Sequence, residues 1–205
     1  MFSEEAGWIK EALKSVNNVP HKTAGNFGSS TGYFRKHIQP HIHNFIFGPL
    51  ESTGWKVQHI DIKAEEGVDV VADITAPSFS HNFAGRYSLI FCTNMLEHVT
   101  NIPLVINNLL AAAEKNAYIL LTVPYKYKKH LDPIDNMFRP TPERIDELFS
   151  HVSHSVVKAG IVTIHNKEYY RVKKSAFPLW GYRERMLYYV GRRHKVSALL
   201  IQLNN

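Results

Sequence analysis

Short apolar runs alternate with amphipathic segments along most of the chain. Residues 87–93 and 118–123 are continuous apolar runs, which is typical of strands that are covered on both faces. Between them, apolar residues recur at helical spacing over residues 101–115, which predicts a helix. Further strands are predicted at residues 23–27, 56–60, 68–71, 155–164 and 196–203.

Helices are predicted in several of the segments between these strands. Ser3 is followed by two glutamates and is expected to cap an amphipathic helix within residues 1–20. Another helix is expected to begin at Tyr33 and to be stopped by Pro40. A later helix should begin with Pro142 at its first position.

The alternation of strands and helices predicts an α/β fold with a mostly parallel seven-stranded sheet and helices on both faces. The last two strands should form a hairpin, which would make the sheet mixed. A chain of 205 residues fits a single domain, residues 1–205. Within it, a basic and aromatic insertion at residues 165–195 precedes the last strand.

The composition, with 44% hydrophobic and 20% charged residues, is that of a globular protein. The single cysteine, Cys92, excludes an intramolecular disulfide and is expected to be part of the core. The first residues lack the basic start and apolar run of a signal peptide, and no apolar stretch is long enough to cross a bilayer. These features together predict a cytoplasmic protein.

The formal net charge is +6, and much of the excess lies in residues 167–195. This segment would form either a solvated basic face or a surface for a phosphorylated or lipid-linked acceptor. Its aromatic residues would form an ordinary packed helix, a lid, a dimer face or a membrane-surface patch, so peripheral membrane contact stays open. No nucleic-acid-binding motif accompanies the charge, so we expect no nucleic-acid partner.

Candidate binding residues follow the predicted strands. The segment from Gly28 to Gly32 (GSSTG) lies between a strand and a helix, where glycine allows a tight turn and backbone N–H groups are expected to be free for a ligand. Asp61 ends the next strand, where a carboxylate accepts hydrogen bonds from a ribose diol. A helix cap is the alternative role for Asp61. Loop and acid together predict an adenosine-bearing cofactor without separating NAD from S-adenosylmethionine.

Longer motifs favour S-adenosylmethionine over NAD, because they resemble those of a known family. Residues 94–99 (NMLEHV) resemble the NxLEHV signature of class I methyltransferases. Residues 123–142 (VPYKYKKHLDPIDNMFRPTP) are similar to a stretch of small methyltransferases of the type 11 group, as are residues 61–73 (DIKAEEGVDVVAD). The resemblance covers roughly residues 23–150. It implies a Rossmann-like methyltransferase that uses S-adenosylmethionine and releases S-adenosylhomocysteine.

The resemblance also implies roles for individual residues. The glycine loop would approach the methionyl part of the cofactor, Asp61 would hold the ribose, Asp73 would face the adenine amino group, and His98 would lie near the transferred methyl group. The cofactor residues implied in this way are Gly28, Ser29, Ser30, Gly32, Asp61, Ile62, Asp73, Ile74, Asn94, Met95 and Leu96.

The chain departs from the family pattern at three positions. Asn26 stands where an acidic residue is usual, Ser30 where a glycine is usual, and Ser88 where an aspartate is common. A serine fits such a turn only if its φ is negative or the strain is tolerated. These departures keep open a second interpretation, a catalytically degenerate cofactor-binding partner subunit.

The acceptor side offers two histidines at strand ends. His98 and His130 are candidate bases for a hydroxyl acceptor, because the histidine pKa suits proton transfer near neutral pH. Asp132 would orient His130 and complete the predicted catalytic set, and Asp135 would orient it or polarise the acceptor. The structural alternatives are a helix start at His98 and a self-bonded loop at His130.

Tyr125, Asp135 and Arg139 are the predicted substrate contacts, although Arg139 would equally pair with Asp132 or Asp135 to hold the loop. We therefore predict O- or N-methylation of a small molecule or saccharide intermediate, with oxygen favoured. The remaining alternative is an NAD-dependent Rossmann oxidoreductase, against which the loop lacks the third glycine of the dinucleotide fingerprint.

No metal is predicted from the sequence. His37 and His41 would share a helical face, but Pro40 interrupts that helix. No other cluster in the sequence has the spacing of metal ligands.

Overall fold

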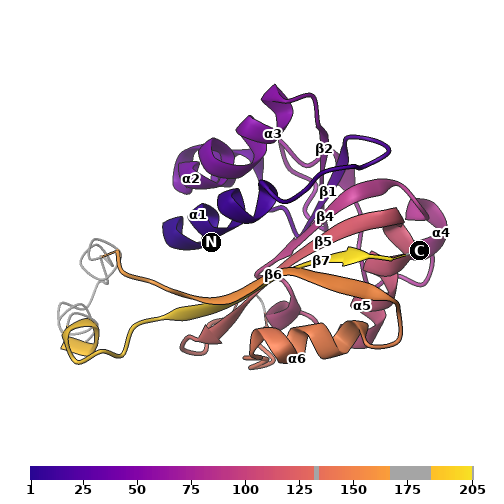
Figure 1. Cartoon of the computed structure of the whole chain (residues 1–205). Coiled ribbons are helices and arrows are strands. Elements are labelled where there is room, and N and C mark those ends of the chain that lie inside the picture. Colours follow the sequence, from indigo (N-terminus) through magenta and orange to yellow (C-terminus); the bar gives the residue numbers. More distant parts are fainter. Residues whose placement is uncertain (132–133, 167–185, 205) are drawn as a thin grey trace.

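A seven-stranded sheet forms the centre of the protein, as the sequence predicts (Figure 1). The computed structural model describes residues 1–131, 134–166 and 186–204. The strand order is β3-β2-β1-β4-β5-β7-β6. The strands are β1 (Thr23–Phe27), β2 (Lys56–Asp61), β3 (Val70–Val71), β4 (Tyr87–Thr93), β5 (Ala113–Lys126), β6 (His154–Thr163) and β7 (Lys195–Leu203).

The sheet is parallel from β3 through β5, and β7 runs antiparallel between β5 and β6. The mixed sheet with a final hairpin is therefore confirmed. Because β1 has β2 on one side and β4 on the other, the strand order reverses at β1. In open α/β sheets, ligands bind at the carboxyl ends of the strands that flank such a point.

Helical segments cover both faces of the sheet (Figure 1). In β4, Leu89 and Phe91 belong to one core cluster with α1, while Ile90 and Cys92 belong to another with α5. This double burial explains the continuous apolar run. The helical segments are α1 (Ser3–Leu13), η1 (Phe34–Ile38), α2 (Pro40–Ile42), η2 (His43–Phe47), α3 (Gly48–Ser52), α4 (Phe79–Phe83), η3 (Leu96–His98), α5 (Ile102–Ala112), α6 (Pro142–Asp146) and η4 (Glu147–Phe149).

Three predicted helix boundaries are wrong. Phe2 rather than Ser3 caps α1, and the Glu5 carboxylate accepts a hydrogen bond from the Phe2 N–H at 3.1 Å. Pro40 begins α2 instead of ending the helical region, because a proline at the first position loses no needed N–H donor. Residues 113–115 belong to β5, whose pairing with β4 begins at Ala113.

The arm formed by β6 and β7 extends beyond the other strands (Figure 1). Tyr188 packs there against Val162 and Val196 in a third, smaller cluster. Residues 167–185, which hold most of the predicted basic and aromatic insertion, lie outside the described residues. Within the described part of the chain, every helix is too short or too polar to cross a bilayer.

Candidate active site

A cavity of about 880 Å³ lies at the carboxyl ends of β1, β4 and β5. Its walls come from the first residues of the chain, the loop after β1, the η1–α2 region, and the segments that follow β4 and β5. This volume is within the range of small-molecule sites, roughly 300–1,000 Å³. The cavity is therefore where the strand-order rule places a ligand. Predicted site residues that line it are Gly28, Ser29, Ser30, Asn94, Met95, His98 and His130.

The glycine loop is packed too closely for larger residues. Gly28 has a φ of +69°, and a Cβ atom there would lie 3.0 Å from the Met95 Sδ atom. A Cβ atom on Gly32 would lie 3.1 Å from the Cα atom of Gly67. Ser30 occupies the position where the family usually has glycine. Its φ of +56° is positive, so the serine is held in a strained, left-handed backbone conformation.

Asp61 is joined to this loop. Its Oδ2 atom accepts a hydrogen bond of 2.6 Å from the Ser30 N–H, and its Oδ1 atom accepts one of 3.1 Å from the Lys63 N–H. Ser30 and Lys63 line the cavity, and the Asp61 carboxylate lies directly behind them. Because a carboxylate has about four lone-pair sites, Asp61 keeps acceptor capacity for a ribose diol.

The expectation that the loop N–H groups are free is wrong for four of them. Gly28 and Ser29 both donate to the Ile60 carbonyl, at 3.0 and 3.1 Å, and Gly32 donates to the Glu66 carbonyl at 2.8 Å. The fourth is the Ser30 N–H described above. Nearby β2 and its following loop satisfy these donors. The loop therefore offers a ligand close backbone approach rather than free donors.

The guanidinium of Arg35 holds the same loop from behind. It is buried and donates to the carbonyls of Ser29 (2.9 Å), Ser30 (2.6 Å) and Gly67 (2.5 Å). Burial lowers the pKa of Arg35, and the negative charges of Asp69 and Asp61 oppose this shift. The sequence analysis missed this residue, since an arginine in a helical segment gives no sign that it points inward.

Asn26, the second departure from the family pattern, pairs with a histidine. Its Nδ2 atom lies 3.0 Å from the His59 Nδ1 atom. Burial, and then the charge of Arg35, lower the pKa of His59 to about 4. The ring is therefore neutral at neutral pH, and its Nδ1 lone pair accepts from the Asn26 amide. A neutral pair replaces the usual carboxylate here.

The predicted adenine contacts lie beside the cavity without lining it. Asp73 is exposed, and its Oδ1 atom accepts hydrogen bonds from the Thr75 N–H and hydroxyl, at 2.8 and 2.7 Å. Ile74 is buried in the core, whereas Ile62 is 67% exposed. The Asp73 carboxylate thus caps a turn through its Oδ1 atom.

A buried glutamate that the sequence did not point to lies under the segment after β4. The Glu5 Oε1 atom accepts hydrogen bonds from the Asn94 side-chain amide at 2.7 Å and from the Thr122 hydroxyl at 2.6 Å. Asn94 has a φ of +50°, a conformation that asparagine tolerates. Leu96 is fully buried in the core and fixes this turn by packing.

Glu97 is the second buried carboxylate. It is fully buried, and neither of its carboxylate oxygens has a hydrogen-bond partner among the described residues. Burial raises the pKa of Glu97 to about 8, and the negative charge of Glu5 adds to the shift. Such a group is rare in proteins, because an unpaired buried carboxylate is costly.

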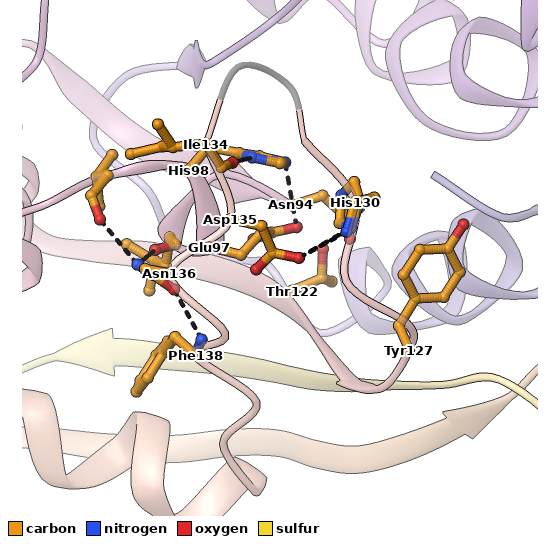
Figure 2. Close-up of polar contacts among 12 residues, drawn as sticks. Asn94, Glu97, His98, Thr122, Tyr127, His130, Ile134, Asp135, Asn136 and Phe138 are labelled. Carbon is orange, nitrogen blue, oxygen red and sulfur yellow. Dashed lines mark hydrogen bonds and ion pairs between the residues drawn. The ribbon is translucent and has the colours of Figure 1, made fainter.

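His98 and His130 face each other next to Glu97 (Figure 2). Their ring centroids are 5.0 Å apart, and the rings are nearly perpendicular. The His98 Nδ1 atom lies 2.6 Å from the carbonyl oxygen of Ile134, to which it donates. This bond leaves the His98 Nε2 atom with a lone pair, 3.8 Å from the Glu97 Oε1 atom.

Asn136 joins the two loops that carry these histidines (Figure 2). Its side-chain amide donates to the carbonyls of Leu96 and Val99, both at 2.8 Å. Its backbone N–H donates to the Glu97 carbonyl at 2.9 Å. This role of Asn136 could not be predicted, because the hydrogen bonds join residues about 40 positions apart in the chain.

Asp135 and Arg139 form a buried ion pair at 2.6 Å. Burial alone would raise the pKa of Asp135, but hydrogen bonds from Arg139 and from the N–H groups of His130 and Met137 outweigh it and hold the pKa well below its usual range. The loop-holding role considered for Arg139 is thus observed. Tyr127 rather than the predicted Tyr125 lines the cavity, and Asp132 lies outside the described residues.

Comparisons with known proteins agree with this geometry. Residues 25–172, more than half of the chain, match the profile of the methyltransferase domain family. The chain therefore belongs to this family and is a class I, S-adenosylmethionine-dependent methyltransferase. Of the three interpretations of the sequence (a methyltransferase, a degenerate partner subunit and an NAD-dependent oxidoreductase), the methyltransferase is the one that is confirmed. No curated protein sequence matches the chain significantly.

Several solved structures share the fold at low identity. Magnesium protoporphyrin IX methyltransferase from Synechocystis, with bound S-adenosylmethionine, is 12% identical, with a TM-score of 0.55 over 98% of this chain and 79% of that one. A methyltransferase from Archaeoglobus fulgidus is 10% identical, with a TM-score of 0.57 over 96% and 94%. Coclaurine N-methyltransferase is 13% identical, with a TM-score of 0.57 over 97% and 71%.

Proposed function

We propose that this enzyme methylates an oxygen, or alternatively a nitrogen, of a small molecule or saccharide intermediate that enters the cavity beside His98. The observation that carries the proposal is the 2.6 Å contact between the His98 Nδ1 atom and the Ile134 carbonyl oxygen, which selects one tautomer of the neutral ring. Because its Nδ1–H group is bonded to the Ile134 carbonyl, its Nε2 lone pair is held in the cavity wall. That is the arrangement that a proton-bearing nucleophile requires.

The residues present fit the cofactor. The loop from Gly28 to Ser30 would pass along its methionyl part, where side chains larger than glycine at position 28 would meet Met95. The free lone pairs of Asp61 would accept the ribose hydroxyls, and Asp73 with Ile74 would border the adenine. Bound S-adenosylmethionine supplies an electrophilic methyl group on a sulfonium.

The protein's own part is to position the acceptor and receive its proton. The His98 Nε2 atom is the candidate proton acceptor, and His130 would orient the acceptor from the opposite side. Asp135 and Arg139 hold the His130 loop through their ion pair. A catalytic role for Asp132, a substrate contact from Tyr125, a single domain over 1–205 and a cytoplasmic location stay predictions.

The first test is calorimetric titration with S-adenosylmethionine, S-adenosylhomocysteine and NAD. We expect micromolar binding of the first two and none of NAD. The bound enzyme is then offered sets of hydroxyl and amine acceptors, and S-adenosylhomocysteine release and product mass are measured. Methylated alcohols support oxygen transfer, methylated amines alone would replace it by nitrogen transfer, and binding of NAD in place of the other two would overturn the cofactor assignment.

A further inference from the structure

Glu97, His98 and His130 bring three metal-ligating groups together. One donor atom from each side chain lies within 4.8 Å of the others. The sequence showed no metal-ligand spacing here, because His130 follows β5 whereas Glu97 and His98 follow β4. The fold places the carboxyl ends of these paired strands side by side. Figure 2 shows the three side chains converging from the two segments.

The buried carboxylate of Glu97 points to a ligand. Both of its oxygens are buried and without a hydrogen-bond partner among the described residues. A carboxylate withdrawn from water in this way stays ionised in proteins only where it is paired or coordinates a metal. In the part of the chain that the structure describes, Arg139 is bonded to Asp135 rather than to Glu97.

Both histidines carry the supporting contacts of metal ligands. His98 donates its Nδ1–H group to the Ile134 carbonyl, which leaves the Nε2 atom for a cation. The His130 Nδ1 atom lies 3.3 Å from the Asp135 carboxylate, which is within ion-pair distance but not in hydrogen-bond geometry, and that carboxylate is held by Arg139. Metal-binding histidines almost always have such a carbonyl or carboxylate behind the ring.

The local charges also favour a cation. Three carboxylates, those of Glu5, Glu97 and Asp135, are buried around this point. The charge of Arg139 offsets part of their negative charge. A divalent cation beside Glu97 would bring the remaining charges close to balance.

We propose that Glu97, His98 and His130 bind a divalent transition-metal cation, such as zinc, at the acceptor end of the cavity. Two imidazoles and one carboxylate suit such cations better than magnesium or calcium, which prefer all-oxygen sites. Three protein ligands leave a coordination position open for an acceptor hydroxyl. Ligands of a tetrahedral zinc ion are about 3.4 Å apart, so small side-chain rotations complete the site.

The catalytic part of this inference rests on the proposed oxygen methylation. With the cation bound, the His98 Nε2 lone pair would be a metal ligand and would no longer be the proton acceptor. The cation would instead hold the acceptor hydroxyl oxygen and lower its pKa, so that its proton leaves to water in the cavity. The oxygen–methyl bond then forms as the sulfur–methyl bond breaks, which gives a methyl ether, S-adenosylhomocysteine and one proton.

The experiment measures metal binding directly. The full-length protein is treated with EDTA, freed of chelator and titrated with Co²⁺, followed by the visible absorption of the bound ion and by calorimetry, with Zn²⁺ as competitor. The variants are Glu97→Gln, His98→Asn and His130→Asn. His81→Asn, at an exposed histidine of α4, is the matched control. Circular dichroism and S-adenosylmethionine affinity report whether each variant is folded.

We expect one Co²⁺ per chain with micromolar or tighter affinity, displaced by Zn²⁺. Each site variant should weaken binding about tenfold or more, and the control should not. Absence of saturable binding up to millimolar Co²⁺, or equal weakening by His81→Asn, overturns the site. If Co²⁺ binds as expected but the EDTA-treated enzyme methylates an alcohol at full rate, the catalytic part is overturned and the proposed function stands.

Discussion

The backbone N–H of Ser30 donates a hydrogen bond of 2.6 Å to the Asp61 carboxylate, and this bond joins the loop after β1 to the end of β2. The carboxylate therefore has two tasks. It accepts the N–H of Ser30, which has a left-handed conformation, and we propose that it also accepts the cofactor ribose hydroxyls. Mutants can distinguish these two roles, because an asparagine at position 61 can still accept the hydrogen bond from the Ser30 N–H.

We expect Asp61→Ala to weaken S-adenosylmethionine binding by about tenfold to a hundredfold, the range for hydrogen bonds to a charged group. Asp61→Asn should lose less, because its amide oxygen still accepts the Ser30 N–H. Calorimetric titration measures both. Glu147→Gln, at an exposed acid paired with Arg144, is the control. Unchanged affinity in Asp61→Ala would overturn the cofactor placement.

Ser30→Gly should stabilise the protein by about 1 kcal/mol, because glycine adopts a positive φ without the cost that a Cβ atom brings. The Ser30 contacts use its backbone N–H and carbonyl, which glycine keeps. Urea unfolding of the two proteins measures the difference. The exposed Ser52→Gly in α3 serves as control and should destabilise, and a destabilised Ser30→Gly would contradict the strain argument.

Arg35→Lys should lower the free energy of unfolding by about 2–4 kcal/mol and weaken S-adenosylmethionine binding. A lysine cannot reproduce the fork that bonds the Ser29, Ser30 and Gly67 carbonyls, so buried acceptors are left unsatisfied. Urea unfolding and calorimetry measure the two effects. Arg144→Lys, on an exposed arginine, should change neither. An Arg35→Lys variant of native stability would contradict the role.

The mostly parallel sheet and the helices on both of its faces could be predicted because β4 and β5 are apolar on both faces. The residues at which helices end were harder to predict. The sequence 113–115 has no feature that separates the last turn of α5 from β5, and pairing with β4 decides it. Local propensity is weak evidence where tertiary pairing competes.

The positions of candidate side chains were predictable where they depend on a single strand end, as for Asp61 at the end of β2 and His98 after β4, and their roles stay predictions. It was not predictable where contacts cross the chain. Glu5 reaches Asn94 and Thr122 over about 90 and 120 residues, and Asn136 reaches Leu96 over 40. The expectation of free N–H groups after β1 was wrong for the same reason, since the Ile60 and Glu66 carbonyls and the Asp61 carboxylate, from a different strand and loop, accept their hydrogen bonds.

Replacing His98 by two different amides tests its role. His98→Asn keeps a donor for the Ile134 carbonyl and removes the Nε2 atom, so turnover should fall by about a hundredfold or more. In His98→Gln the longer side chain places its amide away from the Nδ1 position, so the hydrogen bond to the Ile134 carbonyl is lost, and activity should also fall. S-adenosylmethionine affinity should change by less than about threefold in both. The readout is kcat alongside the cofactor Kd, with His81→Asn as control; full turnover in His98→Asn would remove the residue from the mechanism.

The Asn26–His59 pair predicts acid sensitivity. The pKa of His59 is about 4 in the folded protein, whereas an ordinary histidine has a pKa of 6.5, so the unfolded state takes up the proton first as the pH falls. The contribution of the neutral His59 ring to the free energy of unfolding is fully present above pH 6.5, and it is lost progressively as the pH falls toward 4. Protonation would also place a donor against the Asn26 amide and a charge near Arg35 and Lys36.

We therefore expect the free energy of unfolding to fall by about 2 kcal/mol more in the native protein than in His59→Asn between about pH 8 and pH 5. The asparagine keeps a polar partner for Asn26 at the Nδ1 position and has no proton to take up. Urea unfolding at each pH measures the two slopes. His81→Asn, at an exposed histidine of α4, is the control. Equal slopes for the native protein and His59→Asn would show that the ring is not held neutral by the fold, and would remove the explanation for the asparagine at position 26.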